Sequence, residues 1–262
     1  QAVKQLEKAL NSQLFIRTQK GVRLTAEGGL LFPYVERGIE NLLDGERMLR
    51  RLVDLDMGEV RIGASDMTLQ FYLLPHLERF HGRYPNIKVM VSNAPTPETI
   101  QSLYEGRIDF GVVSTPFDAR PEVAVRPVKK IRNVFVAGSQ YQSLKGKRLE
   151  YGALMDLPCI FLEKNTSTRR FMDQFLEERG IFLEPEFELA TSDMVVQFAM
   201  RNLGIGCVMD EFAREKIEAG ELFELTFGER MPDREICIVT DRKNPVSPAG
   251  ERFLEVLGAS GI

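Results

Sequence analysis

The chain has 262 residues, 44% of them hydrophobic and 27% charged, which is the composition of a globular protein long enough for two domains. No window approaches 18 uninterrupted apolar residues, which excludes a membrane-spanning helix, and we expect no membrane partner. Three separated cysteines in apolar runs and only two histidines predict buried reduced thiols, no metal site and no cofactor, and they favour a cytoplasmic protein.

The net charge of −4 is unevenly distributed. The first 25 residues carry one acidic side chain, Glu7, against the basic side chains of Lys4, Lys8, Arg17, Lys20 and Arg23. A basic end on an acidic body is expected where that end contacts the phosphates of a nucleic acid. A solvated surface would look the same, so the asymmetry alone leaves both interpretations open.

The chain begins in a helix. Apolar residues at every third or fourth position predict a helix over residues 1–10, and a chain that opens inside a helix is expected to lack an upstream segment. Two short strands, 14–16 and 22–24, flank the segment 17–21. Its basic residues and its final glycine predict a hairpin with a basic tip.

A long helix follows the hairpin. Thr25 is a typical helix N-cap, and the helical pattern continues to about Leu55, a length of roughly 46 Å. Pro33 predicts a kink or a later start. Because no small domain buries a helix of this length, we expect its apolar stripe to pack against a second copy of the chain. The stripe comprises Val35, Ile39, Leu42, Leu43, Leu49, Leu52 and Val53.

After a short hinge at 54–58, strands and helices alternate, which is the pattern of an α/β domain. The expected strands are 60–64, 87–91, 110–113, 134–136, 159–162, 187–190, 205–208 and 236–240. The expected helices are 69–84, 97–105, 167–179, 193–202, 211–218 and 248–257.

The N-terminal residues resemble a known DNA-binding motif. The spacing of the second half of the winged helix-turn-helix in LysR-type transcriptional regulators is matched by Ala2-Val3, Leu6-Glu7, Leu10, Leu14-Phe15, Arg17, Lys20 and Leu24-Thr25. The first helix of that motif and the start of its recognition helix are absent. The resemblance therefore predicts that this chain taken alone binds DNA poorly.

The rest of the chain is similar to the effector domain of the same family, and the similarity is carried by Val60 to Ser65, Leu74-Pro75, Leu103 to Gly111 and Gly204-Ile205-Gly206. The implied fold is an α/β effector domain of two Rossmann-like lobes, the type-2 periplasmic-binding-protein fold. A partial winged helix-turn-helix and a long linker helix would precede it.

The resemblance also implies where the domains begin and end. Residues 1–24 would be the partial DNA-binding domain, 25–58 the linker and dimerisation helix with its hinge, and 59–262 the effector domain. In the effector domain, lobe I would comprise 60–127 and 240–262, and lobe II 128–239.

The resemblance gives roles to residues at the basic end. Lys4 would contact the major groove or a phosphate, and Arg17 and Lys20 in the wing would contact the DNA backbone or the minor groove. Thr25 would cap the linker helix, whose N-terminal N–H groups bind a phosphate. The alternative is that these are solvated charges on a small domain.

Small molecules bind open α/β sheets at the carboxyl ends of strands, near helix N-termini. Polar residues at such places are Ser65, Thr96, Thr115, Asn165, Thr166, Ser167 and Ser192. Thr96 precedes Pro97 and is expected to cap its helix. Caps and ligand contacts use the same residue types, so each single assignment stays open. The convergence of the set predicts an effector site between the lobes.

The expected ligand is a small-molecule effector, with an anion or a carboxylate as the first candidate. Free N–H groups at helix N-termini favour an anion. Acidic residues near the same ends would repel one: Asp66, Glu98, Asp193 and Asp210. Arg132 and Arg169 would offset them, so the sequence leaves the sign of the charge in the cleft open.

An enzyme is not expected. Gly204-Ile205-Gly206 lacks the third glycine of a dinucleotide fingerprint, and no Gly-x-Ser-x-Gly, Ser-x-x-Lys or HExxH motif occurs. The alternatives are a solute-binding protein of a transporter, which shares the two-lobed fold, and a lobed biosynthetic enzyme.

The prediction is a LysR-type regulator that binds promoter DNA as a homo-oligomer, a dimer through the linker helix and a tetramer of such dimers. The effector would change the angle between the lobes, and the linker helices would then change the spacing of paired DNA-binding domains.

Overall fold

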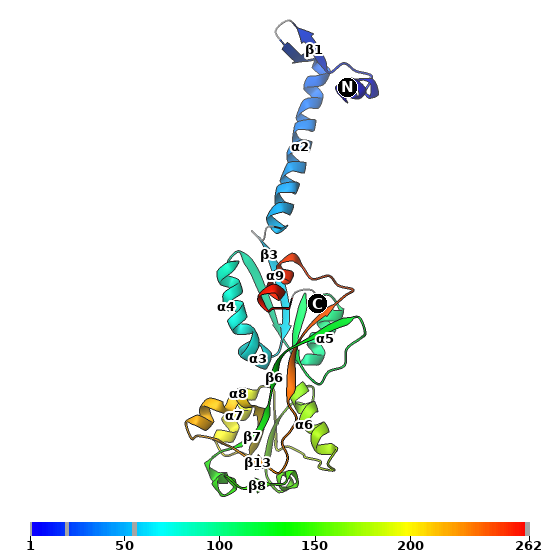
Figure 1. Ribbon diagram of the computed structural model, residues 1–262. Helices are drawn as coiled ribbons and strands as arrows, with labels where there is room; N and C mark the ends of the chain where they lie inside the picture. The colour runs from blue at the N-terminus through cyan, green and yellow to red at the C-terminus, as the bar shows by residue number, and fades with distance from the viewer. Residues whose placement is uncertain (1, 19–20, 54–56, 260–262) are drawn as a thin grey trace. The chain divides into compact units, whose positions relative to one another are not determined.

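The computed structural model describes residues 2–18, 21–53 and 57–259. The chain divides into two units, residues 1–57 and residues 58–262 (Figure 1). Within the described ranges, no helix combines the length and the apolar character that crossing a bilayer requires.

The first unit is a short helix, a hairpin and a long helix. Helix α1 is Ala2–Ala9, strands β1 (Phe15–Thr18) and β2 (Gly21–Leu24) pair antiparallel, and α2 is Ala26–Val53. The predicted cap is confirmed, because Thr25 Oγ1 accepts a hydrogen bond from the Gly28 N–H at 2.9 Å. The predicted later start at Pro33 is wrong. The helix begins at Ala26 and continues through this proline, and Gly29, whose carbonyl loses its helical donor there, is exposed to water.

Leu14 joins these elements. It is the one buried large hydrophobic residue among the described residues of the first unit. Its N–H donates to Glu7 Oε1 at 2.8 Å and its carbonyl accepts from the Thr25 N–H at 3.0 Å. A Cβ on Gly28 would lie 2.2 Å from the Leu14 carbonyl oxygen, so only glycine permits this approach of the hairpin to α2.

The second unit contains two five-stranded sheets with matching topology. The first sheet has the order β4 (Ile87–Asn93), β3 (Gly58–Ala64), β5 (Phe110–Ser114), β14 (Arg234–Asp241) and β6 (Val123–Ile131). Strands β4, β3 and β5 are parallel to one another. Strand β14 pairs antiparallel with β5, and β6 pairs antiparallel with β14. Helices α3 (Asp66–Thr68), η1 (Leu69–Leu73), α4 (Leu74–Arg83), α5 (Thr96–Tyr104) and α9 (Pro248–Val256) accompany it. Figure 1 shows α4 and α5 on opposite faces of the sheet.

The second sheet has the order β10 (Phe187–Leu189), β9 (Cys159–Leu162), β11 (Ile205–Met209), β7 (Asn133–Ala137) and β12 (Phe223–Glu224). Strands β10, β9 and β11 are parallel to one another. Strand β7 pairs antiparallel with β11, and β12 pairs antiparallel with β7. Its helices are α6 (Ser167–Glu177), α7 (Ser192–Met200) and α8 (Asp210–Glu218). A small parallel pair, β8 (Arg148–Leu149) with β13 (Thr226–Phe227), and the short helices η2 (Ser139–Leu144) and η3 (Tyr151–Asp156) complete this lobe.

The chain crosses between the sheets twice. Strand β6 leads through Arg132 into β7, and the return leads into β14. The predicted lobe boundaries, after 127 and after 239, fall inside β6 and β14. These two strands pair with each other along nearly their whole length, so both belong to the first sheet.

Strand β6 was not among the expected strands. Pro127 lies in its middle and has no N–H to donate, so the segment resembles a loop in sequence. The structure accommodates the proline because β6 is an edge strand with one partner, β14, and because the register shifts at Ile236/Cys237, opposite Pro127.

Each lobe has its own apolar core. The first lobe buries Val60, Ile62, Phe80, Leu103, Phe110 and Phe253. The second buries Phe135, Tyr151, Phe161, Met172, Phe175 and Ile205. The predicted helix over 69–84 is wound more loosely at its start, where η1 is a π-helix. Pro75 cannot donate to the carbonyl of Phe71, and Lys129 Nζ donates to that oxygen instead, at 3.2 Å.

Candidate functional site

A cavity of about 350 Å³ lies between the two lobes of the second unit. Its walls are the carboxyl ends of β3, β4 and β5 in the first lobe and of β9 and β10 in the second, with the helix N-termini that follow them. Of the seven predicted effector contacts, six line this cavity: Ser65, Thr96, Asn165, Thr166, Ser167 and Ser192.

Three helices that begin at the cavity are capped by a side chain. Ser65 Oγ accepts from the Thr68 N–H at 3.4 Å, Thr166 Oγ1 from the Arg169 N–H at 3.2 Å, and Thr191 Oγ1 from the Met194 N–H at 3.4 Å. Each cap occupies one donor of the first helical turn, and the other free N–H groups of that turn remain available to a ligand.

Thr96 does not cap its helix. The N-cap position of α5 is Pro95, no side chain caps this helix, and Thr96 is its first residue. The prediction that Thr96 acts as a cap is therefore wrong, because the turn into α5 begins one residue earlier. Its side chain is buried in the cavity wall.

Thr115 is not among the residues that line the cavity. Its Oγ1 accepts from the Glu235 N–H at 3.0 Å, and its carbonyl accepts from Arg234 Nη1 at 2.8 Å. The residue before it, Ser114, lines the cavity instead, and its Oγ lies 2.6 Å from the Ser167 Oγ. Ser114 was not among the predicted contacts, because β5 extends one residue beyond the expected end of that strand.

The charges on the cavity wall are all acidic. Asp66, Glu98 and Glu163 line it, and none of its described lining residues is cationic. Asn93 Nδ2 donates to Asp66 Oδ1. The cavity therefore has carboxylates and hydroxyls on its walls, together with helix N–H groups.

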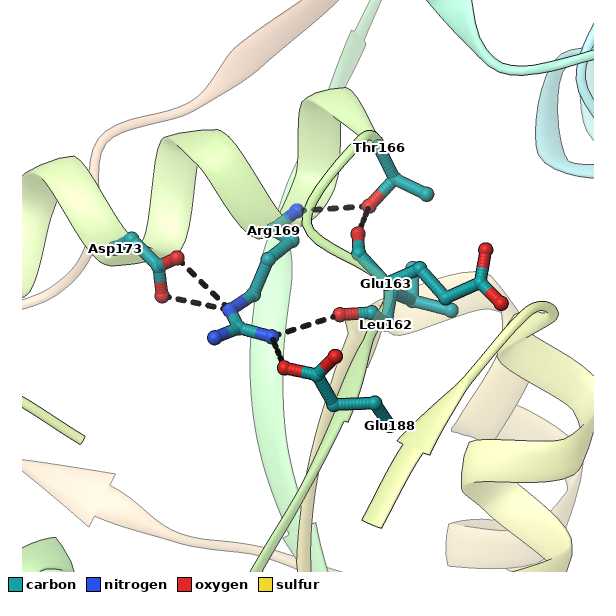
Figure 2. A network of polar contacts seen from close by, with 6 residues as sticks. All are labelled: Leu162, Glu163, Thr166, Arg169, Asp173 and Glu188. Carbon is teal, nitrogen blue, oxygen red and sulfur yellow. Dashed lines mark hydrogen bonds and ion pairs between the residues drawn. The ribbon is translucent and has the colours of Figure 1, made fainter. Parts of the chain in front are cut away.

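The two arginines expected to offset these carboxylates are engaged elsewhere. Arg132 pairs with Glu224 at 2.8 Å and with Asp210 at 3.5 Å. Figure 2 shows Arg169 bonded to Asp173, to Glu188 and to the Leu162 carbonyl, at distances of 2.8 to 3.0 Å.

Arg169 holds the loop that forms one cavity wall. Burial alone would lower the pKa of its guanidinium, but the hydrogen bonds and charges of Asp173 and Glu188 outweigh burial and raise it. The Thr166 hydroxyl donates to the Glu163 carbonyl at 2.9 Å, which closes the loop (Figure 2). Arg169 thus fixes the start of α6 against β9 and β10 without presenting its charge to the cavity.

The basic residues of the first unit are exposed. Lys4 is exposed on α1 and Arg17 on β1, and Thr25 caps α2, which begins at Ala26. Lys20 lies outside the described residues. In the hairpin register Arg17 is opposite Val22.

The remaining reactive side chains do not gather into a second site. Within the described ranges, no group of three or more His, Cys, Asp or Glu side chains is placed to hold a metal ion. Burial raises the pKa of the Cys159 and Cys207 thiols to about 12 and that of Cys237 to about 11. These thiols therefore stay protonated at neutral pH.

Taken with the basic hairpin unit, this polar cavity between two lobes defines the class of ligand-responsive DNA-binding proteins. Residues 54–261 match the model of the LysR substrate binding domain, and residues 1–29 match that of the bacterial regulatory helix-turn-helix protein, lysR family. The chain belongs to the LysR family of transcriptional regulators, and the predicted family and fold class are confirmed.

Several curated proteins and solved structures are similar to the chain. The uncharacterized HTH-type transcriptional regulator YeiE of Escherichia coli K12 is 26% identical over 100% of this chain and 87% of its own length. A probable RuBisCO transcriptional regulator of Cyanidium caldarium is 27% identical over 98% of this chain and 83% of its own length. The Synechocystis CcmR regulatory domain in complex with 2-PG has a TM-score of 0.69 at 19% identity, covering 78% of this chain and 97% of that one. None of these supports the alternative of a solute-binding protein.

Proposed function

We propose that this regulator binds its small-molecule effector in the cavity between the lobes. The observation that carries the proposal is the convergence of capped helix N-termini and buried hydroxyls from both lobes on one cavity of about 350 Å³. The complex of the CcmR regulatory domain with 2-PG supports a small molecule as the ligand. The contacts would come from Ser65, Thr96, Ser114, Asn165, Thr166, Ser167 and Ser192.

Effector binding would act through the angle between the lobes. A ligand held from both sides favours one arrangement of the lobes over others, and it shifts the population by the difference in its affinity for them. Within residues 57–259, two chain crossings, at Arg132 and just before Arg234, connect the lobes. A change at the cavity therefore becomes a rotation about these crossings.

The DNA contacts are proposed for the first unit. Lys4 and Arg17 are exposed cations on α1 and β1, and Lys20 belongs to the same hairpin in sequence. The N-terminus of α2, capped by Thr25, offers backbone N–H groups to a phosphate. The partner is double-stranded promoter DNA.

The proposed assembly is a dimer through α2, with a tetramer formed from two dimers. The apolar residues along this helix are exposed: Leu30, Phe32, Tyr34, Val35, Ile39, Leu42, Leu43 and Leu49. The predicted stripe also includes Leu52 and Val53, whose side chains lie outside the described set. An apolar surface of this length on one helix is typical of a coiled-coil interface.

We propose three functional parts with the limits expected from the sequence: residues 1–24 for DNA binding, 25–58 for the linker helix and hinge, and 59–262 for the effector domain. Gly58, assigned to the hinge, is the first residue of β3. No catalytic activity is proposed for this cavity.

A thermal-shift screen tests the effector site. The chain is titrated with carboxylates, amino acids and inorganic anions, and at least one class is expected to raise the midpoint of thermal unfolding. The Ser167→Ala variant should lose this shift, while Ser143→Ala, at an exposed serine outside the cavity, should keep it. A ligand that stabilises Ser167→Ala as well as the unsubstituted chain would show that the cavity is not the effector site.

A further inference from the structure

Two buried serine hydroxyls at the cavity share one hydrogen bond, which uses only one of their two hydroxyl hydrogens. Ser114 is 1% exposed and Ser167 is 8% exposed, and their oxygens lie 2.6 Å apart. Only one of the two can donate to the other, and neither oxygen has another partner within the part of the chain that the structure describes. One hydroxyl hydrogen is therefore free to donate to a ligand oxygen.

Thr168 adds a second donor beside this pair. Its Oγ1 accepts from Arg234 Nη2 at 2.8 Å, and its own hydroxyl hydrogen has no acceptor among the described residues. A hydroxyl that accepts from a cation is polarised and becomes a stronger donor. Thr168 thus transmits the positive field of Arg234 to the cavity wall.

Arg234 is a buried charge without a counter-ion. It is 2% exposed and donates to Asn133 Oδ1, the Thr115 carbonyl and Thr168 Oγ1, all neutral oxygens. No described carboxylate forms an ion pair with it, in contrast to the buried Arg169, which has two. Burial lowers its pKa to about 10, so it remains charged at neutral pH.

The opposite charge lies elsewhere on the same cavity. Asp66 and Glu98 belong to the first turns of α3 and α5, and Glu163 follows β9. Figure 2 shows the Glu163 carboxylate directed away from Arg169, outside its network. The cavity lining therefore combines the hydroxyls of Ser114, Ser167 and Thr168, next to the buried Arg234, with three carboxylates.

We propose that the effector carries both a carboxylate and an ammonium group, as amino acids do. Its carboxylate accepts from the Ser114–Ser167 pair and from Thr168, and becomes the counter-ion of Arg234. Its ammonium group donates to the carboxylates of Asp66, Glu98 and Glu163. This assignment rests on the proposed function of the cavity as the effector site.

Other charge types fit less well. A polyanion would meet three acidic side chains without a cationic partner on the wall. A simple cation would leave Arg234 and the free hydroxyl hydrogens as they are. A molecule with both charges matches both parts of the cavity. The acidic residues are expected to attract its ammonium group and to repel its carboxylate.

Matched ligands separate these possibilities. The full chain is titrated calorimetrically with the twenty common amino acids and with ω-amino acids from β-alanine to 6-aminohexanoate. Each is compared with its deaminated carboxylic acid and its decarboxylated amine. We expect at least one amino acid to bind about tenfold or more tightly than both counterparts, one charge-assisted contact being lost in each.

Two kinds of variant test the two ends. Thr168→Val removes the polarised hydroxyl at nearly constant volume and should weaken binding of the amino acid about tenfold. Thr226→Val, outside the cavity, should leave this affinity unchanged. Glu98→Gln and Glu163→Gln should each weaken binding of the amino acid severalfold. They should also strengthen binding of its deaminated acid, because a charge that repels the carboxylate is removed. Glu218→Gln, an exposed carboxylate on α8, controls for net charge.

The outcomes are distinct. Binding of deaminated acids as tight as that of amino acids, with loss in Ser167→Ala, overturns the amino-acid assignment and leaves the effector site in place. The absence of any amino-acid binding also overturns it. Binding that neither Thr168→Val nor Ser167→Ala changes overturns both the assignment and the proposed function.

Discussion

The two units of this regulator differ in the burial of their large apolar side chains. In the second unit, side chains such as Phe80, Phe110 and Phe253 are fully buried and pack ring against ring, at centroid distances of 4.7 and 5.7 Å. In the first unit nearly all large hydrophobic side chains are exposed, and Leu42 is 76% exposed. The second unit therefore completes its core within one chain, and the first does not.

The two units are therefore suited to different functions. A lobe with its own core is a stable wall for a cavity, and small changes in the angle between two such lobes are transmitted without loss of folding. A long helix with an exposed apolar stripe gains stability by burying that stripe, and a second copy of the helix is the surface that matches it.

The largest effect is expected in the core of the second unit. Phe253→Ala removes a fully buried ring that contacts Phe80 and Phe110, and should lower the free energy of unfolding by about 3–5 kcal/mol. Urea denaturation measures it. Leu30→Ala, at an exposed position on α2, is the matched control and should change the free energy of unfolding of the second unit by less than about 0.5 kcal/mol. Equal losses would contradict the division into two units.

The next effect concerns association through α2. Ile39→Ala with Leu42→Ala removes two exposed apolar side chains from each copy, and should weaken the dimer by about 3 kcal/mol or more, a hundredfold rise in Kd. Dilution followed by light scattering measures it. Glu40→Ala, on the same helix outside the stripe, should leave Kd unchanged. A double variant that associates as tightly as the unsubstituted chain would place the interface elsewhere.

A smaller effect is expected at the cap of α2. Thr25→Ala removes the acceptor of the Gly28 N–H and should destabilise the first unit by about 1 kcal/mol, whereas Thr25→Ser retains the hydroxyl and should lose little. Circular dichroism during thermal unfolding measures it. Equal behaviour of the two variants would show that the cap contributes nothing.

The cysteines of the second unit give a pH-dependent prediction. Burial raises the thiol pKa values of Cys159 and Cys207 from 9.0 to about 12, so the unfolded chain loses these protons first. The free energy of unfolding should therefore be unaffected by these thiols below about pH 9 and should fall as the pH rises from there towards 12. A disulfide-exchange reagent at pH 8 should label no thiol in the native protein and all three after denaturation. Rapid native labelling would show that a thiol is accessible.

The smallest effect is on DNA binding by the hairpin. Arg17→Ala should reduce the slope of log affinity against log salt concentration by about one, because one phosphate contact is lost. Arg242→Ala, an exposed arginine of the second unit, is the control. A slope that stays the same in Arg17→Ala would remove this residue from the DNA contact.

Much of the fold could be predicted from the sequence because its periodicities are strong. The alternation of strands and helices from Val60 to Leu257 and the cap at Thr25 follow local rules, and the structure has them close to the expected residues. Strand β6 escaped because Pro127 breaks the local pattern, and only pairing with β14 makes it a strand. The predicted lobe boundaries, after 127 and after 239, fall inside β6 and β14 because the pairing of these two strands was not expected.

The candidate site could be predicted in outline and not in its charges. Six of the seven effector residues line one cavity, because polar residues at strand ends and helix starts mark such sites. Ser114 and Thr168 were missed because β5 extends one residue beyond its expected end, and because Thr168 follows the expected contacts as the second residue of α6. Arg234 is the clearest case. Its importance comes from burial without a carboxylate, which depends on packing between segments far apart in sequence.

Sedimentation equilibrium of the unsubstituted chain tests whether a second copy of the chain completes the first unit. At micromolar concentration we expect a mass of at least twice the 29.8 kDa of one chain, with tetramers at higher concentration. A single species of 29.8 kDa across the range would contradict it.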